Sequence, residues 1–463
     1  MLIYTHIHSF NADLETPVGL YLNLRDRYRK PILLESNDYH SRSDSTSYIG
    51  LNPLVEITVE DHFIQVQVAE TQQEIAIEDR SKLTEQLATI LASVEFESPE
   101  LANNGFFSYF SFEYAHFEES IDLKASSLGL PKAQLILYEY LIVLDHFHDN
   151  GSIIVNSLTS EVPSTENLEQ LLRKKTTNCL PFVKDGLPES SLSDDDFREN
   201  VSIAQQHIQR GDVFQLVLSR PFSQRFFGDD FQVYRQLRRL NPSPYLFYAD
   251  MESYRLMGSS PEAQIQLKNG KASIHPIAGT VRKTGNETVD AELTHQLIHD
   301  EKENAEHTML VDLARNDLSK YCDEVKINSY KEVQRFSHVI HLVSKVTGRL
   351  QETAPLTLFS GTFPAGTLSG TPKPKALELI QRYEGDTRDY YGGAIGFIRT
   401  NGDLNLAIVI RSILSKNDQL HYRAGAGIVL DSIPENELQE VYNKLGAVQK
   451  AIVAAHSPLT IEL

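Results

Sequence analysis

The segment DEKENAEHTMLVDLARNDL (300–318) places carboxylates where a helix would otherwise bury apolar side chains. At 100° per residue, a helix over these positions gathers Leu310 and Leu313 on one apolar stripe. Glu306 points along the middle of that stripe, with Glu303 nearby. Because burying an unpaired ionised acid costs several kcal/mol, we expect these carboxylates to be neutralised, exposed in a cleft or bound to a cation.

The segment ENELQEVYNK (435–444) repeats this pattern in a helix that begins after Pro434. Its apolar stripe is flanked along one edge by Glu437, Glu440 and Lys444. Two Glu-x-x-Glu edges that face one cavity suit a hard divalent ion, most naturally Mg²⁺. The candidate metal ligands are therefore Glu303, Glu306, Glu437 and Glu440. The alternative is a pair of solvated helix faces, and the inward placement of Glu306 favours the metal.

The composition limits the classes of function. At 463 residues the chain can form two or three domains or one large composite domain. Its net charge of −20 has the wrong sign for nucleic-acid binding, and an anionic substrate would need local attraction from a metal, helix N-termini or placed cations. No apolar run approaches a membrane span and no leader is visible, so we expect a cytoplasmic protein. Cys179 and Cys322 have no metal-ligand spacing and are expected to be plain thiols.

Periodicity and turn residues divide the chain into three regions, 1–155, 156–196 and 197–455, of which the second is a polar surface connection. Strands and helices do not alternate in regular βαβ units, which favours an α+β fold with large antiparallel or mixed sheets. The expected helices cover 82–93, 135–147, 197–210, 300–318 and the segment after Pro434. The expected strands cover 32–34, 54–59, 63–68, 213–219, 245–250, 263–267 and 404–413.

Three glycine-bearing turns in the last region can offer backbone N–H groups to an anion: PIAGT (276–280), GTLSG (366–370) and GAG (425–427). Each alone is better explained as a tight turn, since none is a nucleotide-binding fingerprint. Arg411 stands at the end of an apolar strand and suits bidentate capture of a carboxylate. His341 suits proton transfer near neutral pH, although a lone histidine on an apolar segment is more often a core residue.

The order of these pieces resembles the chorismate-utilising enzymes, most closely the anthranilate synthase component I family. The matching segments are PIAGT (276–280), ENAEHTMLVDLARNDL (303–318), HLVSKV (341–346), GTLSGTPK (366–373), YYGGAIGF (390–397), IVIRS (408–412), AGAGIVLDS (424–432) and ENELQEVYNK (435–444). The resemblance is dense from about Phe197 to Ile452 and sparse before it. It implies a β-sandwich flanked by helices with the active-site cleft between the halves, and a regulatory N-terminal region before the catalytic one.

The resemblance also implies roles for individual residues. Glu262 would be the general acid that protonates the departing C4 hydroxyl of chorismate, and His341 would assist the loss of pyruvate. Mg²⁺ on Glu306 and Glu440, supported by Glu303 and Glu437, would hold the chorismate dianion. The implied substrate-binding residues are Gly279, Thr280, Thr367, Tyr391, Arg411, Gly425, Ala426, Gly427 and Lys444.

The residues at two positions distinguish between the activities found in this family. Relatives that make aminodeoxychorismate have a lysine nucleophile where this chain has Ala278, and relatives that make isochorismate have a lysine base where it has Gln215. Neither side chain can do that work, so ammonia, which is already a nucleophile, is the expected attacker and anthranilate the expected product.

Further segments look like the family's tryptophan feedback site: LLES (33–36) and NPSPYLF (241–247). Ser36, Pro244, Tyr245 and Leu246 would clasp an indole and an amino-acid head group, while the alternative is a Pro-kinked edge strand. No segment resembles a glutaminase, so ammonia implies a separate glutamine amidotransferase subunit (component II) and a hetero-oligomer. Two other functions stay open: aminodeoxychorismate synthesis without the lysine, and a catalytically silent regulator that binds tryptophan or chorismate.

Overall fold

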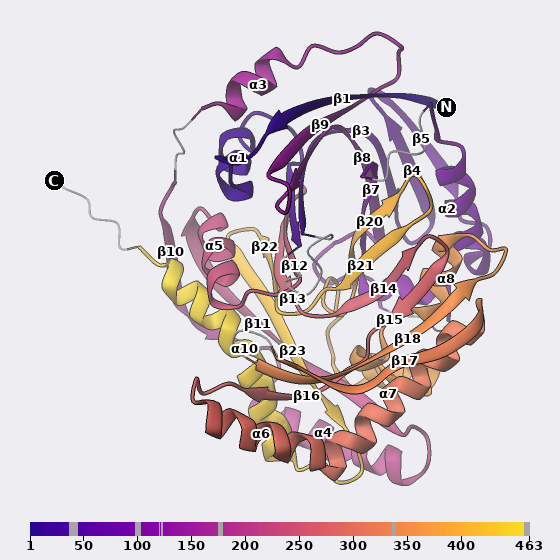
Figure 1. Ribbon diagram of the computed structural model, residues 1–463. Helices are drawn as coiled ribbons and strands as arrows, with labels where there is room; N and C mark the ends of the chain where they lie inside the picture. Colours follow the sequence, from indigo (N-terminus) through magenta and orange to yellow (C-terminus); the bar gives the residue numbers. More distant parts are fainter. Residues whose placement is uncertain are drawn as a thin grey trace.

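The computed structural model describes residues 1–36, 45–97, 103–119, 121, 124–174, 179–335 and 339–457, apart from the side chains of Ala278, Thr280, Arg282, Lys302 and Val339. Its centre is a large curled sheet of mainly antiparallel strands, with helices on the outside (Figure 1). The expected α+β fold with sheets flanked by helices is confirmed. The helices are α1 (Pro17–Leu24), α2 (Leu83–Ala92), α3 (Glu166–Leu172), α4 (Asp194–Gln209), α5 (Phe231–Leu240), α6 (Glu287–His299), α7 (Glu301–Ser319), α8 (Pro355–Thr362), α9 (Lys373–Tyr383) and α10 (Pro434–Ala455), with the 3₁₀ helices η2 (Arg80–Lys82), η3 (Phe112–Phe117) and η4 (Gly366–Leu368).

The sheet has two arms that meet at strand β8 (Ala133–Asp145), because β8 pairs with β3 on one edge and with β7 and β9 on the other. The first arm runs through β3 (Thr46–Val59), β2 (Ile32–Ser36), β12 (Tyr245–Asp250), β13 (Arg255–Ser260), β22 (Ser412–Lys416), β23 (Gln419–Ile428), β11 (Gln215–Gly228) and β10 (Phe182–Glu189). The second runs through β7 (Gly105–Phe110), β20 (Ala394–Arg399), β21 (Leu404–Ile408), β14 (Ala263–Lys268), β15 (Lys271–Ile274) and β18 (Val339–Leu350), which pairs with β16 (Ile277–Arg282) and β17 (Cys322–Arg335).

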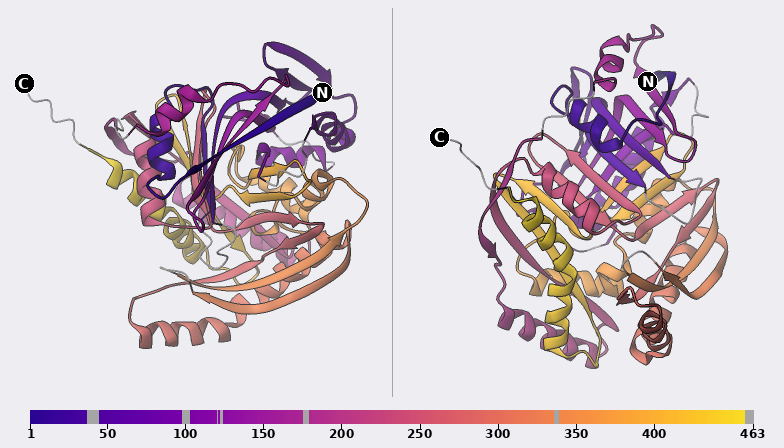
Figure 2. Two further views of the ribbon diagram at one scale, coloured as in Figure 1. Left: turned by 45° about the horizontal axis from the view of Figure 1, so that its top comes forward. Right: turned by 60° about the vertical axis from the view of Figure 1, so that its left-hand side comes forward.

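Shorter pairings complete the sheet: β1 (Leu2–Asn11) with β9 (Asn150–Ser157) and β6 (Glu95–Phe96), β4 (Phe63–Val68) with β3 and β5 (Thr71–Ala76), and β19 (Gly370–Thr371) with β11. Helices α4, α5 and α10 lie along the first arm, whereas α6 and α7 lie against the β16–β18 end of the second (Figures 1 and 2). Helix α7 also reaches the first arm, because Gln215 on β11 donates to Glu306 of α7 at 2.9 Å.

The chain crosses between the arms at two short connections. Residues 261–262 join β13 to β14, and residues 409–411 join β21 to β22. The two connections lie side by side, because the Ile408 amide donates to the Glu262 carbonyl at 3.0 Å and the Ser259 amide donates to the Arg411 carbonyl at 3.2 Å. This topology brings Glu262 and Arg411 together from positions about 150 residues apart.

Most expected elements are present, but two differ. The segment 135–147 is not a helix: β8 occupies it, and its run of buried residues reflects a strand covered on both faces. The strand expected over 404–413 is two strands, β21 and β22, separated by the crossing at Arg411. The start of α4 follows its sequence closely, since Ser193 and Asp196 form a capping box.

Strand pairing links the three regions that the sequence suggested. The pair β2–β12 and the pair β7–β20 each join the first 155 residues to the last region. The connecting region 156–196 contributes β10 to the edge of the first arm. The three regions therefore share one sheet, and their division into a regulatory region, a connection and a catalytic region stays a prediction.

Both cysteines are free thiols, Cys179 exposed and Cys322 buried, as expected. In the described part of the chain, no helix combines the length and apolar character that a membrane crossing requires.

Candidate functional site

Glu262 and Arg411 stand together where the chain crosses between the arms. Burial raises the pKa of Glu262 to about 8, and the Thr367 hydroxyl, 3.3 Å from Oε1, and Arg411 offset that rise only in part. The carboxyl is therefore protonated at neutral pH and can donate a proton.

The Arg411 guanidinium makes no hydrogen bond or ion pair with any described residue, although burial lowers its pKa and Glu262 opposes that effect. Its backbone has a φ of +48°, a conformation that is costly for a residue other than glycine. The crossing thus holds a half-buried cation without a hydrogen-bond partner among the described residues, which suits the capture of a carboxylate from outside the protein.

His341 lies on β18, opposite the PIAGT turn of β16. Its Nδ1 donates to the Gly279 carbonyl at 3.1 Å, because a carbonyl can only accept. This bond makes Nε2 the basic nitrogen, and burial lowers the pKa of the imidazole to about 4. His341 is consequently neutral at pH 7 and can accept a proton.

The acids of the two Glu-x-x-Glu segments meet from α7 and α10. Burial, followed by the neighbouring carboxylates of Glu303 and Glu440, raises the pKa of Glu306 to about 7. Gln215 on β11 donates from Nε2 to Glu306 Oε1 at 2.9 Å, and Glu437 is buried at 1% exposure. Glu306 is half-buried and directed toward β11.

We next ask whether these carboxylates could bind a divalent cation. The carboxylates are the hard oxygen ligands that Mg²⁺ prefers, and a cation would relieve the repulsion that raises the pKa of Glu306. Lys444 lies 2.7 Å from Glu440 Oε1 and would compete for that carboxylate. Among the described residues, no three His, Cys, Asp or Glu side chains are gathered closely enough to hold a metal ion as they stand. The residues fit Mg²⁺ in charge and chemistry, with Glu306 and Glu440 as the central pair.

Two glycines of these turns are packed closely against neighbouring side chains. A Cβ on Gly427 would lie 2.7 Å from Gln215 Nε2 and 3.2 Å from Glu306 Oε1. A Cβ on Gly279, whose φ is +68°, would lie 2.6 Å from Leu297 and 3.3 Å from Glu303 Oε2. Only glycine therefore lets the backbone approach Gln215, Glu306, Leu297 and Glu303 this closely.

The remaining predicted substrate contacts border the same space. Lys444 donates to the Gly425 carbonyl at 2.9 Å, and Tyr391 is buried near Lys444 and Arg388. Ala426 is fully buried in β23 between the two glycines. The side chain of Thr280 lies outside the described part of the chain. The site thus combines a proton donor, a neutral base, cations for carboxylates and a cluster of acids.

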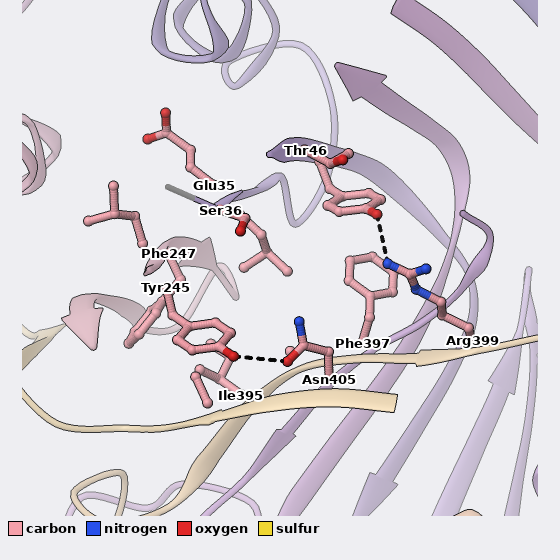
Figure 3. Close-up of a pocket in the computed structure, with 14 residues that line it drawn as sticks. Glu35, Ser36, Thr46, Tyr245, Phe247, Ile395, Phe397, Arg399 and Asn405 are labelled. Carbon is pink, nitrogen blue, oxygen red and sulfur yellow. Dashed lines mark hydrogen bonds between the residues drawn. The ribbon is translucent and has the colours of Figure 1, made fainter. Parts of the chain in front are cut away.

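A second pocket lies between the two arms, lined by residues of β2, β3 and β12 on one side and of β20 and β21 on the other, and contains about 480 Å³ of space, part of it open to solvent. Ser36, Tyr245 and Leu246 line it, whereas Pro244 precedes β12 and is not part of the lining. Figure 3 shows Tyr245 and Phe397 on opposite sides of the space, with polar groups from Arg399 and Asn405 at its rim. An aromatic, mainly apolar space with a cation at its edge suits an aromatic amino acid.

Sequence reasoning missed several residues of this pocket, namely Thr46, Tyr48, Ile395, Phe397, Arg399 and Asn405. Tyr48 accepts from Arg399 Nη2 at 3.1 Å, and Tyr245 donates to Asn405 Oδ1 at 3.2 Å. These residues come from β3, β20 and β21, and no local pattern in the sequence marks them, because only the pairing of distant strands brings them together.

The sequence is similar to that of known proteins over nearly its whole length. The family model described as chorismate binding enzyme matches residues 30–450. Anthranilate synthase component 1 of Aquifex aeolicus is 33% identical over 469 residues, covering 96% of this chain and 93% of that protein. The Lactococcus lactis protein of the same name is 35% identical and covers 96% and 99%.

Solved structures agree with these relatives. Anthranilate synthase component I from Streptococcus pneumoniae matches with a TM-score of 0.76 and 31% identity, covering 95% of this chain and 99% of that one. MenF, the menaquinone-specific isochorismate synthase of Escherichia coli, has the same TM-score at 18% identity, covering 97% and 94%, and shows the shared fold alone.

Proposed function

The chain belongs to the chorismate binding enzyme family, and we propose that it is the anthranilate synthase component I that converts chorismate and ammonia to anthranilate and pyruvate. The observation that carries this proposal is the half-buried Glu262, whose pKa is raised to about 8, beside the uncommitted Arg411. An acid that is neutral at pH 7 next to a carboxylate receptor is what loss of a hydroxyl from an anionic ring requires.

The first step adds ammonia at C2 of the ring while the double bond shifts and the C4 hydroxyl leaves. Glu262 gives its proton to that hydroxyl, which departs as water. Arg411 binds a carboxylate of chorismate, and the backbone around Gly279, Gly425 and Gly427 borders the ring. Gln215 and Ala278 stand where a lysine would direct water or a lysine amine to the ring, which leaves ammonia as the nucleophile.

The second step removes the proton at C2 and releases the enolpyruvyl group as pyruvate, which makes the ring aromatic. His341 is neutral and holds its Nδ1 hydrogen on the Gly279 carbonyl, so Nε2 can take up a proton in this step. When bound, Mg²⁺ would neutralise a carboxylate of the substrate. Glu306 and Glu440 would hold it, supported by Glu303 and Glu437.

We also propose tryptophan as the inhibitor and the second pocket as its site. Tyr245 and Phe397 offer aromatic faces for an indole, and Arg399 offers a cation for the carboxylate. Strand β12, which carries Tyr245, pairs with β13 directly before Glu262, so a ligand there contacts the strands that place the acid. Ammonia would come from a component II glutamine amidotransferase, in keeping with the component 1 names of the relatives.

One assay tests the proposal. Purified protein, chorismate, Mg²⁺ and ammonium are expected to yield fluorescent anthranilate and pyruvate in equal amounts, and added tryptophan is expected to suppress both. Accumulation of 4-amino-4-deoxychorismate would instead make the chain an aminodeoxychorismate synthase. Binding of chorismate or tryptophan without any turnover would make it a regulator.

A further inference from the structure

Two buried side chains that follow α9 fill a gap at the edge of β11. Strand β19 pairs with β11 only at Gln215 and Leu216, and β10 pairs with it only from Ser223 onward. Between these points no strand of the described chain pairs with this edge of β11. A backbone group buried there without a partner would destabilise the fold, because it loses its hydrogen bonds to water.

Arg388 and Glu384 supply the missing partners. Arg388 Nη2 donates to the Val217 carbonyl at 2.8 Å. The Glu384 carboxylate accepts from the Ser219 amide at 2.7 Å and from the Ser219 hydroxyl at 2.9 Å. The two side chains also bind each other, with Arg388 Nε donating to Glu384 Oε2 at 2.9 Å. These two side chains therefore supply the hydrogen bonds that a neighbouring strand would make with this stretch of β11.

The same guanidinium reaches the loop that carries Thr367. Arg388 Nη1 donates to the Leu368 carbonyl, one residue after Thr367. Its guanidinium carbon lies 4.6 Å from the centre of the Phe112 ring and 5.9 Å from that of Tyr391. Arg388 is 2% exposed. Burial raises the pKa of Glu384, but the charges of Arg388 and Arg423 outweigh that effect and leave this pKa lowered. Glu384 and Arg388 therefore form an ionised pair.

These contacts connect two elements that carry residues of the candidate site. Strand β11 carries Gln215, which contacts Glu306, and η4 carries Thr367, which contacts Glu262. We propose that Arg388 is a positioning residue of the reaction, which sets the spacing between β11, η4 and Tyr391 through its planar fork. A lysine cannot replace it, because a single ammonium lacks the fixed geometry that reaches two carbonyls and a carboxylate.

The test compares Arg388 with a second buried arginine on the same carboxylate. The side chain of Arg423 lies 3.8 Å from Glu384 Oε2 and donates to the Thr387 carbonyl, but among the described residues it donates no hydrogen bond to β11 or η4. Arg388→Lys, Arg388→Met and Arg423→Met are assayed by consumption of chorismate, with melting temperatures measured in parallel. This design rests on the proposed function only through the choice of chorismate as substrate.

Both Arg388 variants are expected to lose about 100-fold in kcat, with KM for chorismate changed less than threefold, because a small misplacement of catalytic groups costs that much. Arg423→Met is expected to stay within threefold of wild-type kcat at a comparable loss of melting temperature. Guanidinium at millimolar concentration is expected to restore part of the activity of Arg388→Ala and none of that of Glu262→Gln.

The opposite results would overturn the inference. Equal losses in the Arg388 and Arg423 variants, or an Arg388→Lys enzyme with near-normal kcat, would reduce the pair to a structural ion pair. If Arg388→Met does not fold, Arg388→Lys decides, since it keeps a charge beside Glu384. A wild-type protein that consumes no chorismate would refute the proposed function, whereas an active wild type with active variants would refute only the role of Arg388.

Discussion

At the scale of single residues, the raised pKa of Glu262 has a direct kinetic consequence. The Glu262 carboxyl is protonated below its pKa of about 8 and ionised above it. The fraction of enzyme that can donate this proton is therefore high at neutral pH and decreases as pH rises. We expect turnover per unit of free ammonia to fall above pH 8 and Glu262→Gln to lower kcat by about 10²–10⁴-fold.

The measurement is kcat against pH with ammonia corrected to its neutral form. The matched control is Glu252→Gln, because Glu252 pairs with Arg29 on the surface. A Glu262→Gln enzyme that keeps wild-type turnover would remove Glu262 from the chemistry.

Glu306 gives the second prediction at this scale. Its neighbours Glu303 and Glu440 disfavour its ionised form, so Glu306→Gln removes a repulsion while it removes a candidate metal ligand. We expect turnover at least about 100-fold lower, by analogy with the loss of other ligand-shell groups, and a melting temperature in EDTA that is unchanged or higher.

Turnover over a Mg²⁺ titration and thermal melts with and without the metal would measure both effects. Added Mg²⁺ should raise the melting temperature of the wild type and not that of the variant. Normal turnover in Glu306→Gln would discard the metal assignment.

At the scale of secondary-structure elements, the glycines of β23 and α10 make a matched pair. Gly427→Ala places a methyl group against Gln215 and Glu306, whereas Gly446→Ala meets no atom within 4 Å. Gly446 is in the interior of α10, so its substitution should stabilise the protein by about 0.5–1 kcal/mol with normal turnover.

For Gly427→Ala we expect a strong loss of turnover, because Gln215 and Glu306 must move to make room. Denaturant unfolding together with the chorismate assay separates the two variants. Equal activity in both would mean that the space beside Gly427 is not used by the substrate.

The elements also mark where sequence reasoning succeeds and where it stops. The helical period predicted that Glu306 faces inward, and in the structure this side chain is half-buried and accepts a hydrogen bond from Gln215. The same periodicity failed at 135–147, where a strand buried on both faces gives an apolar run without alternation. The meeting of Glu262 and Arg411 was not predictable in geometry, because it depends on which distant strands pair.

At the scale of the whole molecule, one sheet contains both the catalytic site and the second pocket. Strand β21 carries Asn405 in the wall of that pocket, and its last residue, Ile408, donates to the Glu262 carbonyl. Strands from the first 155 residues pair directly with those that carry the site. Sequence similarity could indicate the two sites but not this shared framework, which requires the register of the strands.

The shared framework predicts reciprocal coupling between tryptophan and chorismate. Thermodynamic linkage requires that if tryptophan weakens chorismate binding by some factor, chorismate weakens tryptophan binding by the same factor, typically about 5–150-fold. The Glu262→Gln enzyme allows both titrations, because it should bind chorismate without consuming it. Calorimetric titration of tryptophan, with and without saturating chorismate, measures the factor directly.

A variant that fills the second pocket provides the control. Ser36→Leu places a larger apolar side chain in the lining of that pocket, away from Glu262 and Arg411. We expect it to abolish tryptophan binding and inhibition together while kcat without tryptophan stays within twofold of wild type. Tryptophan that bound with one affinity regardless of chorismate would show that β12 and β21 do not couple the two sites.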